Sequence, residues 1–326
     1  MSFKRTADYK SGLFFYCLFA LVSITLLLFA GGFTTSIKAG MAFLDWPLSN
    51  GSINPEGWLS ESDKFAEHSH RLLGMQIGLI SIGLVIWTQI KELRAWVRNL
   101  TLLLLAIVIF QGLLGGGRVI FDQLNTATDH NLVAQSFAVA HACGAMLVLT
   151  ILVSLTLASS KIWISGSLDF SKSNTTEASS SGLRQLAWVA YLMTFIQILM
   201  GAIMRHADAG LAIARFPLAN QHSLVPDFWN FAISIHFAHR VGALILTAIL
   251  VYYCIQLFKY KDVHTFFFRM PILISGILFI QIYLGALTIW TVKNPYSATM
   301  HHLVGAFLLA TIWGTTFILG YKKTSD

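Results

Sequence analysis

The chain has 326 residues, of which 56% are hydrophobic and only 11% are charged. A soluble domain carries roughly 25% charged residues, so this composition excludes an ordinary soluble protein. The net charge of +7 does not indicate nucleic-acid binding, because the basic residues cluster beside apolar segments, where such clusters orient a chain in a membrane.

Eight segments are long and apolar enough to cross a bilayer, which takes about 20 residues of helix. They are predicted at 12–34, 67–90, 99–118, 130–158, 184–206, 229–258, 270–291 and 297–320. An open sheet would leave backbone groups unpaired in lipid, so the predicted fold class is an all-α integral membrane protein. The first segment is too long for an ordinary signal peptide and belongs to a regular series, so we expect it to be retained.

Basic residues gather on one side of these segments, and most acidic residues lie on the other. Lys4, Arg5 and Lys10 precede the first segment, and Lys322 and Lys323 follow the last. The positive-inside rule then predicts that both termini are cytoplasmic. No Arg- and Ser-rich transit sequence precedes the first segment, which favours a bacterial plasma (inner) membrane over an organelle.

The chain contains a tandem repeat of a four-helix unit. Landmarks recur in the same order. Trp46-Pro47-Leu48 matches Phe216-Pro217-Leu218, His70-Arg71 matches His239-Arg240 and Gln111 matches Gln281, each at a displacement of about 170 positions, and His141 then matches His302. A segment rich in Ser, Thr and Asn separates the two copies. We predict two pseudo-symmetric four-helix bundles, at 1–158 and 184–326, joined by a cytoplasmic linker at 159–183.

Each half carries one histidine near the outer end of its second segment and one in its fourth. Neutral imidazoles on two facing helices are suitable axial ligands for heme iron, and bundle cores commonly hold cofactors. We therefore predict two heme sites toward the outer face, on His70 with His141 and on His239 with His302. A helix–helix hydrogen bond is the alternative for a single histidine. The neighbouring His301 stays open as a ligand, although the repeat alignment favours His302.

Glu67, His70 and Arg71 lie at i, i+3 and i+4 and therefore share one helix face. The simple interpretation is an interfacial ion pair between Glu67 and Arg71, and the functional one gives Glu67 a catalytic or proton-handling role. Arg71 and Arg240 are predicted to bind heme propionates, which suit an arginine fork. The position equivalent to Glu67 is His236, which we expect beside the second heme. This asymmetry predicts one reactive site and one electron-transfer site.

In this arrangement the chain resembles the heme A synthase family over essentially its full length. The matching residues are Asp45-Trp46-Pro47-Leu48-Ser49-Asn50-Gly51, Glu67-x-x-His70-Arg71, His141, His239-Arg240 and His302. The resemblance implies oxidation of the C8 methyl of heme O to a formyl group, by successive hydroxylations and loss of water, which yields heme A for terminal oxidases. Some bacterial relatives carry a cysteine pair in the first outer loop. With Ser49 and no cysteine there, this chain resembles the members without the pair.

The resemblance also implies a role for each half. The C-terminal bundle, with His239 and His302, would hold a heme b cofactor. The N-terminal bundle, with His70 and His141, would hold the heme O substrate, and the family's essential glutamate falls on Glu67.

The implied partners are the heme O substrate, membrane lipid and an electron donor that the sequence does not identify. Transfer of substrate from a heme O synthase (a protoheme farnesyltransferase), a link to a terminal oxidase assembly pathway and a homo-oligomeric state are left open. The alternative function is a diheme membrane cytochrome that transfers electrons without modifying heme. Such cytochromes often take ligands for both hemes from one helix, a spacing that no segment here has. A transporter of parallel repeats is disfavoured because no segment is broken at mid-membrane.

Overall fold

The structure is a computed structural model that describes residues 8–124, 131–165 and 177–320. Its long helices are α1 (Ser11–Ser36), α2 (Ser62–Lys91), α3 (Ala95–Leu124), α4 (Leu132–Ser159), α6 (Glu177–His206), α7 (Phe231–Phe258), α8 (Thr265–Trp290) and α9 (Pro295–Leu319). Two short elements are α5 (Lys161–Ser165) and the 3-10 helix η2 (Ala209–Leu211). The eight long helices are all apolar and long enough to cross a membrane, which confirms the predicted fold class.

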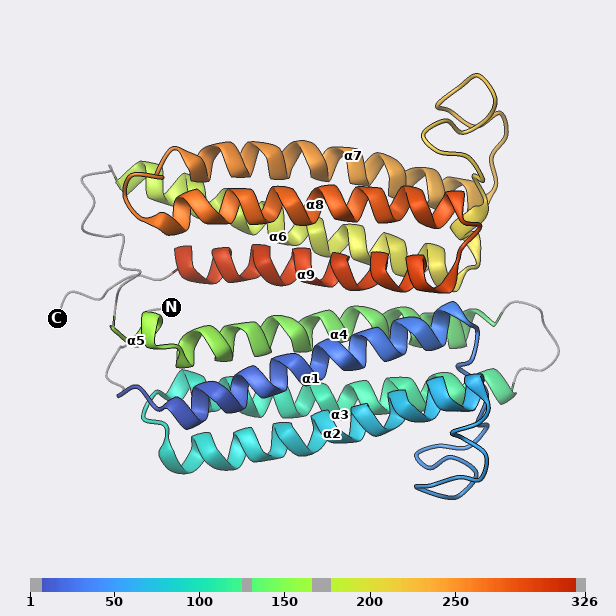
Figure 1. Ribbon diagram of the computed structural model, residues 1–326, viewed down its shortest axis with the longest axis horizontal. Helices are drawn as coiled ribbons and strands as arrows, with labels where there is room; N and C mark the ends of the chain where they lie inside the picture. The colour runs from blue at the N-terminus through green and yellow to red at the C-terminus, as the bar shows by residue number, and fades with distance from the viewer. Residues whose placement is uncertain (1–7, 125–130, 166–176, 321–326) are drawn as a thin grey trace.

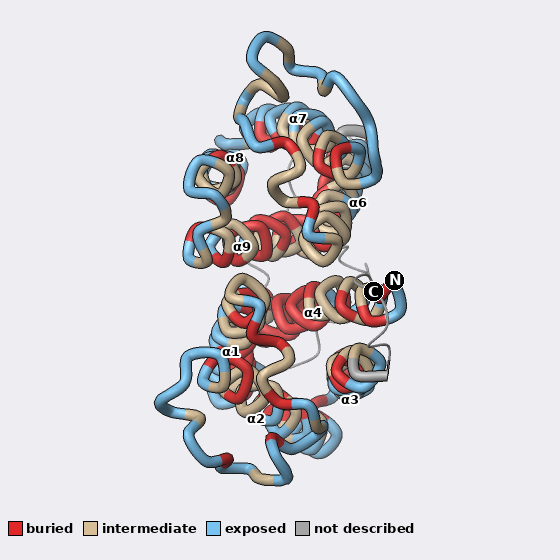
Figure 2. The backbone as a smooth tube through the Cα atoms, turned by 90° about the vertical axis from the view of Figure 1, so that its right-hand side faces the viewer, coloured by how far each residue is buried: buried red, intermediate tan, exposed pale blue. Residues whose placement is uncertain are grey.

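The helices form two side-by-side bundles, one of α1 to α4 and one of α6 to α9 (Figure 1). Seen end-on, consecutive helices are neighbours within each bundle, so that α2 faces α4 and α7 faces α9 across a diagonal (Figure 2). The predicted linker at 159–183 is less irregular than expected, because it includes α5 and the first turns of α6; its central part, 166–176, lies outside the described residues. The division of the halves into a substrate side and a cofactor side stays a prediction.

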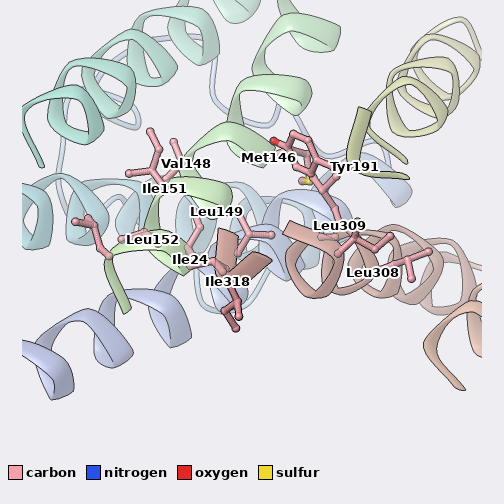
Figure 3. Packing of buried hydrophobic residues seen from close by; sticks show 14 of the residues in the cluster. Ile24, Met146, Val148, Leu149, Ile151, Leu152, Tyr191, Leu308, Leu309 and Ile318 are labelled. Carbon is pink, nitrogen blue, oxygen red and sulfur yellow. The ribbon is translucent and has the colours of Figure 1, made fainter. Parts of the chain in front are cut away.

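One apolar cluster runs through both bundles and joins them where α1, α4, α6 and α9 meet. Ile24, Met146, Leu149, Tyr191 and Leu309 belong to it and come from all four helices (Figure 3). Lipid is as apolar as these side chains, so close packing, rather than exclusion of water, must hold the helices together. The two halves therefore depend on a shared, tightly packed contact.

Hydrogen bonds between side chains reinforce this contact. The hydroxyls of Thr150 and Tyr191 lie 3.1 Å apart, and the Trp313 indole donates to the Ser154 hydroxyl over 2.7 Å. Each bond joins α4 to a helix of the other half. Such bonds between transmembrane helices contribute about 0.6 kcal/mol each on average, so they fix the orientation of the halves more than they stabilise the fold.

The two ends of the molecule differ in their connections. Figure 1 shows the start of α1 and the end of α9 at one end, and the two long loops, 37–61 and 207–230, at the other. We call this second end the loop end. At the opposite end a buried ion pair ties α2, α3 and α4 together: Arg94 lies 2.8 and 2.9 Å from the two carboxylate oxygens of Glu92 and donates to the Ala158 carbonyl over 2.7 Å. Both charged side chains are almost fully buried.

Replacing Glu92 by Gln should destabilise the detergent-solubilised protein, because the buried Arg94 guanidinium loses its counter-ion. Removing one partner of a buried pair costs roughly 3–5 kcal/mol. Burial works to raise the pKa of Glu92, but the hydrogen bonds and charge of Arg94 outweigh burial and lower that pKa in the folded protein. The stabilisation is therefore complete above the unfolded pKa of about 4.3 and is lost as the pH falls through the lower, folded pKa.

Thermal unfolding followed by circular dichroism checks this expectation. The difference in melting temperature between wild type and Glu92→Gln should be constant above about pH 5 and narrow below it. Glu61→Gln is the matched control, because Glu61 makes an exposed ion pair with Lys64 and such pairs contribute little. A Glu92→Gln protein as stable as wild type at neutral pH would contradict the account.

Candidate functional site

Arg71 holds the first long loop against the bundle. Its Nη1 donates to the carbonyls of Asp45 (2.7 Å) and Leu48, and its Nη2 donates to the Phe43 carbonyl over 3.1 Å. Nε and Nη2 also bond the Glu67 carboxylate. All five N–H donors of the guanidinium are therefore used. The predicted propionate contact of Arg71 is at odds with this geometry, since no N–H group is left for it.

Arg240 holds the second long loop in the same way. It donates to the carbonyls of Ile213 (2.9 Å), Arg215 (2.5 Å) and Leu218 (3.2 Å), the repeat equivalents of Phe43, Asp45 and Leu48. Its Nε is buried without a partner among the described residues. Arg240 therefore has one N–H group left that could bind a heme propionate, and this contact stays a prediction. Both arginines hold their loop against the bundle.

Glu67 and His236 perform the same local task in the two halves. The Phe43 N–H donates to Glu67 over 3.0 Å, and the equivalent Ile213 N–H donates to His236 Nδ1 over 3.3 Å. Both side chains are buried. The Glu67–Arg71 ion pair proposed as the simple interpretation is present. A catalytic role for Glu67 stays a prediction, and it must coexist with this structural one.

The Asp45-to-Gly51 motif forms a tight turn within the first loop. The Asp45 carboxylate accepts the backbone N–H groups of Asn50 and Gly51, each over 2.7 Å. Asn50 and Gly51 have φ of 50° and 71°, the left-handed region that these residue types tolerate best. Partial burial works to raise the pKa of Asp45, but the two N–H groups outweigh it and hold that pKa below its usual value. The motif is therefore explained by loop structure.

The structure brings His70 and His141 together across the diagonal of the first bundle. Their ring centroids lie 6.2 Å apart and the rings are perpendicular. Two imidazoles that bind one metal ion from opposite sides would have a similar separation of their ring centroids. That separation is the sum of two metal–nitrogen bonds of about 2.0 Å each and the distance from nitrogen to centroid in each ring. His141 Nδ1 lies 3.0 Å from the Gln111 carbonyl. A bond to that carbonyl fixes the proton on Nδ1 and leaves the Nε2 lone pair free for a metal.

In the second bundle His301, rather than the predicted His302, takes the position of His141. His301 Nδ1 lies 3.0 Å from the Gln281 carbonyl, the repeat equivalent of Gln111. His239 and His301 are close enough to act on each other electrostatically. The His302 ring instead packs against Gly32 of α1, where the two bundles meet.

Helix geometry explains why the sequence alignment paired His141 with His302 and not with His301. His141 stands three residues before Gly144, and His301 stands four residues before Gly305. Each of these glycines meets a glutamine of the adjacent helix, Gln111 or Gln281. Positions three and four apart lie on the same helix face, so either spacing brings the histidine to the interior. An alignment without gaps matches Gly144 to Gly305 and therefore matches His141 to the residue three positions before Gly305, which is His302.

A glycine on the neighbouring helix makes room for each of the four imidazoles. A Cβ atom on Gly31, Gly115, Gly201 or Gly285 would lie 2.7 to 3.4 Å from Cε1 of a histidine ring. The four rings concerned belong to His70, His141, His239 and His301. Larger residues at these positions would displace the rings, so the glycines position the candidate ligands.

The two rings on α2 and α7 differ in their polar surroundings. His239 Nδ1 lies 3.1 Å from the Gln197 amide. The position equivalent to Gln197 is Leu27, and His70 Nδ1 is buried without a hydrogen bond among the described residues; the nearby Leu27 carbonyl does not meet hydrogen-bond geometry. The first bundle therefore presents an incompletely satisfied histidine pair.

The start of α2 brings His70 to the same depth as His141. This helix begins at Ser62, five residues before the predicted segment, and both histidines lie about nine residues from the loop end of their helices. The neighbouring His68 bonds Ser49 Oγ (2.9 Å) and the Ile53 carbonyl (3.0 Å). His68 is therefore part of the support for the first loop.

The residues fit a heme in each bundle. Each bundle has two imidazoles on diagonally opposite helices, with a glycine of a neighbouring helix beside each ring. All four histidines are half-buried. Closely spaced groups of three or more His, Cys, Asp or Glu are absent from the described residues, so the donor set suits a metal that supplies its own equatorial ligands, as heme iron does.

The fold and the site define a multi-pass membrane protein with two duplicated helical bundles and paired interior histidines. Residues 14–313 match the COX15-CtaA family, whose description is cytochrome oxidase assembly protein. This match covers nearly the whole chain, so the chain belongs to that family.

Similar relatives carry the name heme A synthase. The protein of Alkalihalophilus pseudofirmus is 26% identical over 93% of this chain and 96% of its own length. That of an Exiguobacterium species is 27% identical over 94% and 92%, and that of Listeria welshimeri is 26% identical over 94% of both chains. The likeness extends over the full length of each relative.

Replacing Arg71 by Gln should loosen the first loop, because at least three loop carbonyls lose a charged donor. A hydrogen bond to a charged group contributes roughly 1.5–3 kcal/mol, so local opening should become at least about tenfold more frequent. Hydrogen–deuterium exchange of residues 43–51 measures it. Lys64→Gln, which removes an exposed partner of Glu61 nearby, should leave exchange unchanged. Equal exchange in wild type and Arg71→Gln would show that Arg71 does not hold the loop.

Proposed function

We propose that this protein is a heme A synthase, which oxidises the C8 methyl of heme O to a formyl group. The observation that carries the proposal is the pair of interior histidines on diagonally opposite helices of each bundle, with Nδ1 of His141 and of His301 directed to a helix carbonyl. Family membership and the names of the full-length relatives support the same activity. A duplicated site on one chain supports a protein that handles two hemes.

We further propose that the bundles have different tasks. The second bundle, with His239 and His301, would retain heme b as a cofactor, which supplies one-electron chemistry when it is bound. The first bundle, with His70 and His141, would take up the heme O substrate. Glu67, one helical turn from His70 toward the loop end, is the candidate for proton handling beside the substrate.

The proposed setting is a bacterial plasma membrane, with both termini in the cytoplasm and the loop end outside. The basic residues Lys91, Arg94 and Arg98 lie at the end opposite the loops, which supports this orientation. Both heme sites would then lie toward the outer face. The reaction also needs an electron donor, which remains to be identified by experiment.

Pigment extraction tests the activity. Cells that make heme O but lack a heme A synthase should accumulate heme A, or its hydroxylated precursor, only when they express this protein. Chromatography of the extract separates heme O, the hydroxylated precursor and heme A. Glu67→Gln should retain bound heme and lose at least about tenfold in heme A formation, because a positioned general acid or base contributes about 10²–10⁴-fold.

Two outcomes would count against this proposal. Absence of both oxidised hemes from cells with well-expressed wild-type protein would exclude the synthase and favour a diheme cytochrome. If Arg71→Gln lowered the yield of heme A as much as Glu67→Gln does, Glu67 would act through the loop that both residues hold, rather than on the substrate.

Alanine substitutions distinguish the two adjacent histidines of α9. His301→Ala should abolish the tightly bound heme of the purified protein, because it removes an axial ligand. His302→Ala should keep that heme, because its ring packs against Gly32 between the bundles. Absorption spectra and the heme-to-protein ratio report the result. Loss of heme in His302→Ala with retention in His301→Ala would reverse the assignment.

A further inference from the structure

The first bundle contains a cation that neither the histidine pair nor the loop support uses. Arg118 lies on α3, three residues after Gly115 and seven after Gln111, and these spacings place it on the same helix face. Gly115 and Gln111 both contact His141. Because α3 runs toward the loop end (Figure 1), Arg118 lies one turn beyond Gly115, between the histidine pair and the loops.

The Arg118 guanidinium lies at the loop end of the histidine site. A Cβ atom on Gly40 would be 2.6 Å from its Nη1, so it packs directly on the backbone where the first loop begins. Its charge is close enough to His70, His141 and His206 to act on each of them electrostatically. Within residues 8–124, 131–165 and 177–320 it makes no hydrogen bond and no ion pair.

Arg118 is half-buried, and basic residues within transmembrane segments usually face a cavity or mark a place where a ligand binds. The equivalent positions of the second bundle lack this feature. The position equivalent to Arg118 is Thr288, whose hydroxyl bonds the Leu284 carbonyl. The cation beside the equivalent glycine, Gly210, is Lys293, and it lies 3.6 Å from the Asp208 carboxylate. At these equivalent positions, a cation without a partner among the described residues is therefore found in the first bundle and not in the second.

We propose that Arg118 binds a carboxylate of the porphyrin that the first bundle takes up. This inference rests on the proposed function, because it requires the His70–His141 pair to receive a heme. A planar guanidinium can bond a carboxylate through two parallel N–H groups. Arg71, which sequence reasoning selected for this contact, has no donor left. The position of Arg118 directs the carboxylate edge toward the loop end and the rest of the macrocycle into the membrane.

Titration of the purified protein, with its resident heme in place, tests the proposal. The probes are iron protoporphyrin, which carries two free carboxylates, and its dimethyl ester, which carries none. Binding to the first bundle is measured as the part of the absorbance change that the wild-type protein shows and the His70→Ala variant does not. Arg118→Gln should weaken binding of the free acid roughly tenfold to a hundredfold, the effect of losing a charged hydrogen bond. Binding of the ester should not change, and Arg118→Lys should restore part of the preference for the acid.

Two controls make the outcomes distinct. Lys293→Gln, which removes the cation beside Gly210, should leave both affinities unchanged, and an unaltered spectrum of the resident heme shows that each variant is folded. Equal weakening of acid and ester in Arg118→Gln, or no weakening of either, would overturn the proposal while the proposed function stands. If wild type and His70→Ala titrate identically, the first bundle takes up no heme and the proposed function fails with it.

Discussion

The structure depends on holding imidazole rings in one orientation inside a bundle that lies in lipid. A buried histidine without a fixed partner can rotate or exchange its tautomer, and either change removes it as a metal ligand. Here a helix carbonyl receives Nδ1 of His141 and of His301, and glycines on adjacent helices accept the rings. The glycines also explain the close approach of neighbouring helices, so the same residues serve packing and site geometry.

The two long loops are the second constraint on the site, because each crosses the end where its bundle would otherwise be open. Each loop is held by one arginine from the second helix of its bundle, Arg71 or Arg240, through three backbone carbonyls. Both arginines directly follow a candidate ligand, His70 or His239. The residue that anchors each loop is therefore the immediate chain neighbour of a candidate ligand.

Sequence reasoning predicted the eight helices, the duplication and three of the four paired histidines, because apolar length and repeated motifs are local signals. Two spacings give the same helix face, so the alignment paired His141 with His302, whereas the structure places His301 in the equivalent position. Sequence reasoning also assigned Arg71 to a ligand, because the hydrogen bonds of Arg71 to the folded loop cannot be foreseen before the loop is placed. Arg118 carried one available signal: it is a basic residue at the outer end of a segment, against the general charge pattern.

Two differences between the halves concern the α2 and α7 histidines and the cations near the loop end. In the second bundle the Gln197 amide lies beside His239, and Lys293 lies beside Asp208. In the first bundle His70 Nδ1 and the Arg118 guanidinium have no such partner among the described residues. Polar groups that a protein leaves unsatisfied raise the free energy of the empty site and favour the ligand that satisfies them. The Gln197 amide beside His239, and the lack of such a partner for His70 Nδ1 and Arg118, support the proposed division between a retained cofactor and a substrate that must be selected.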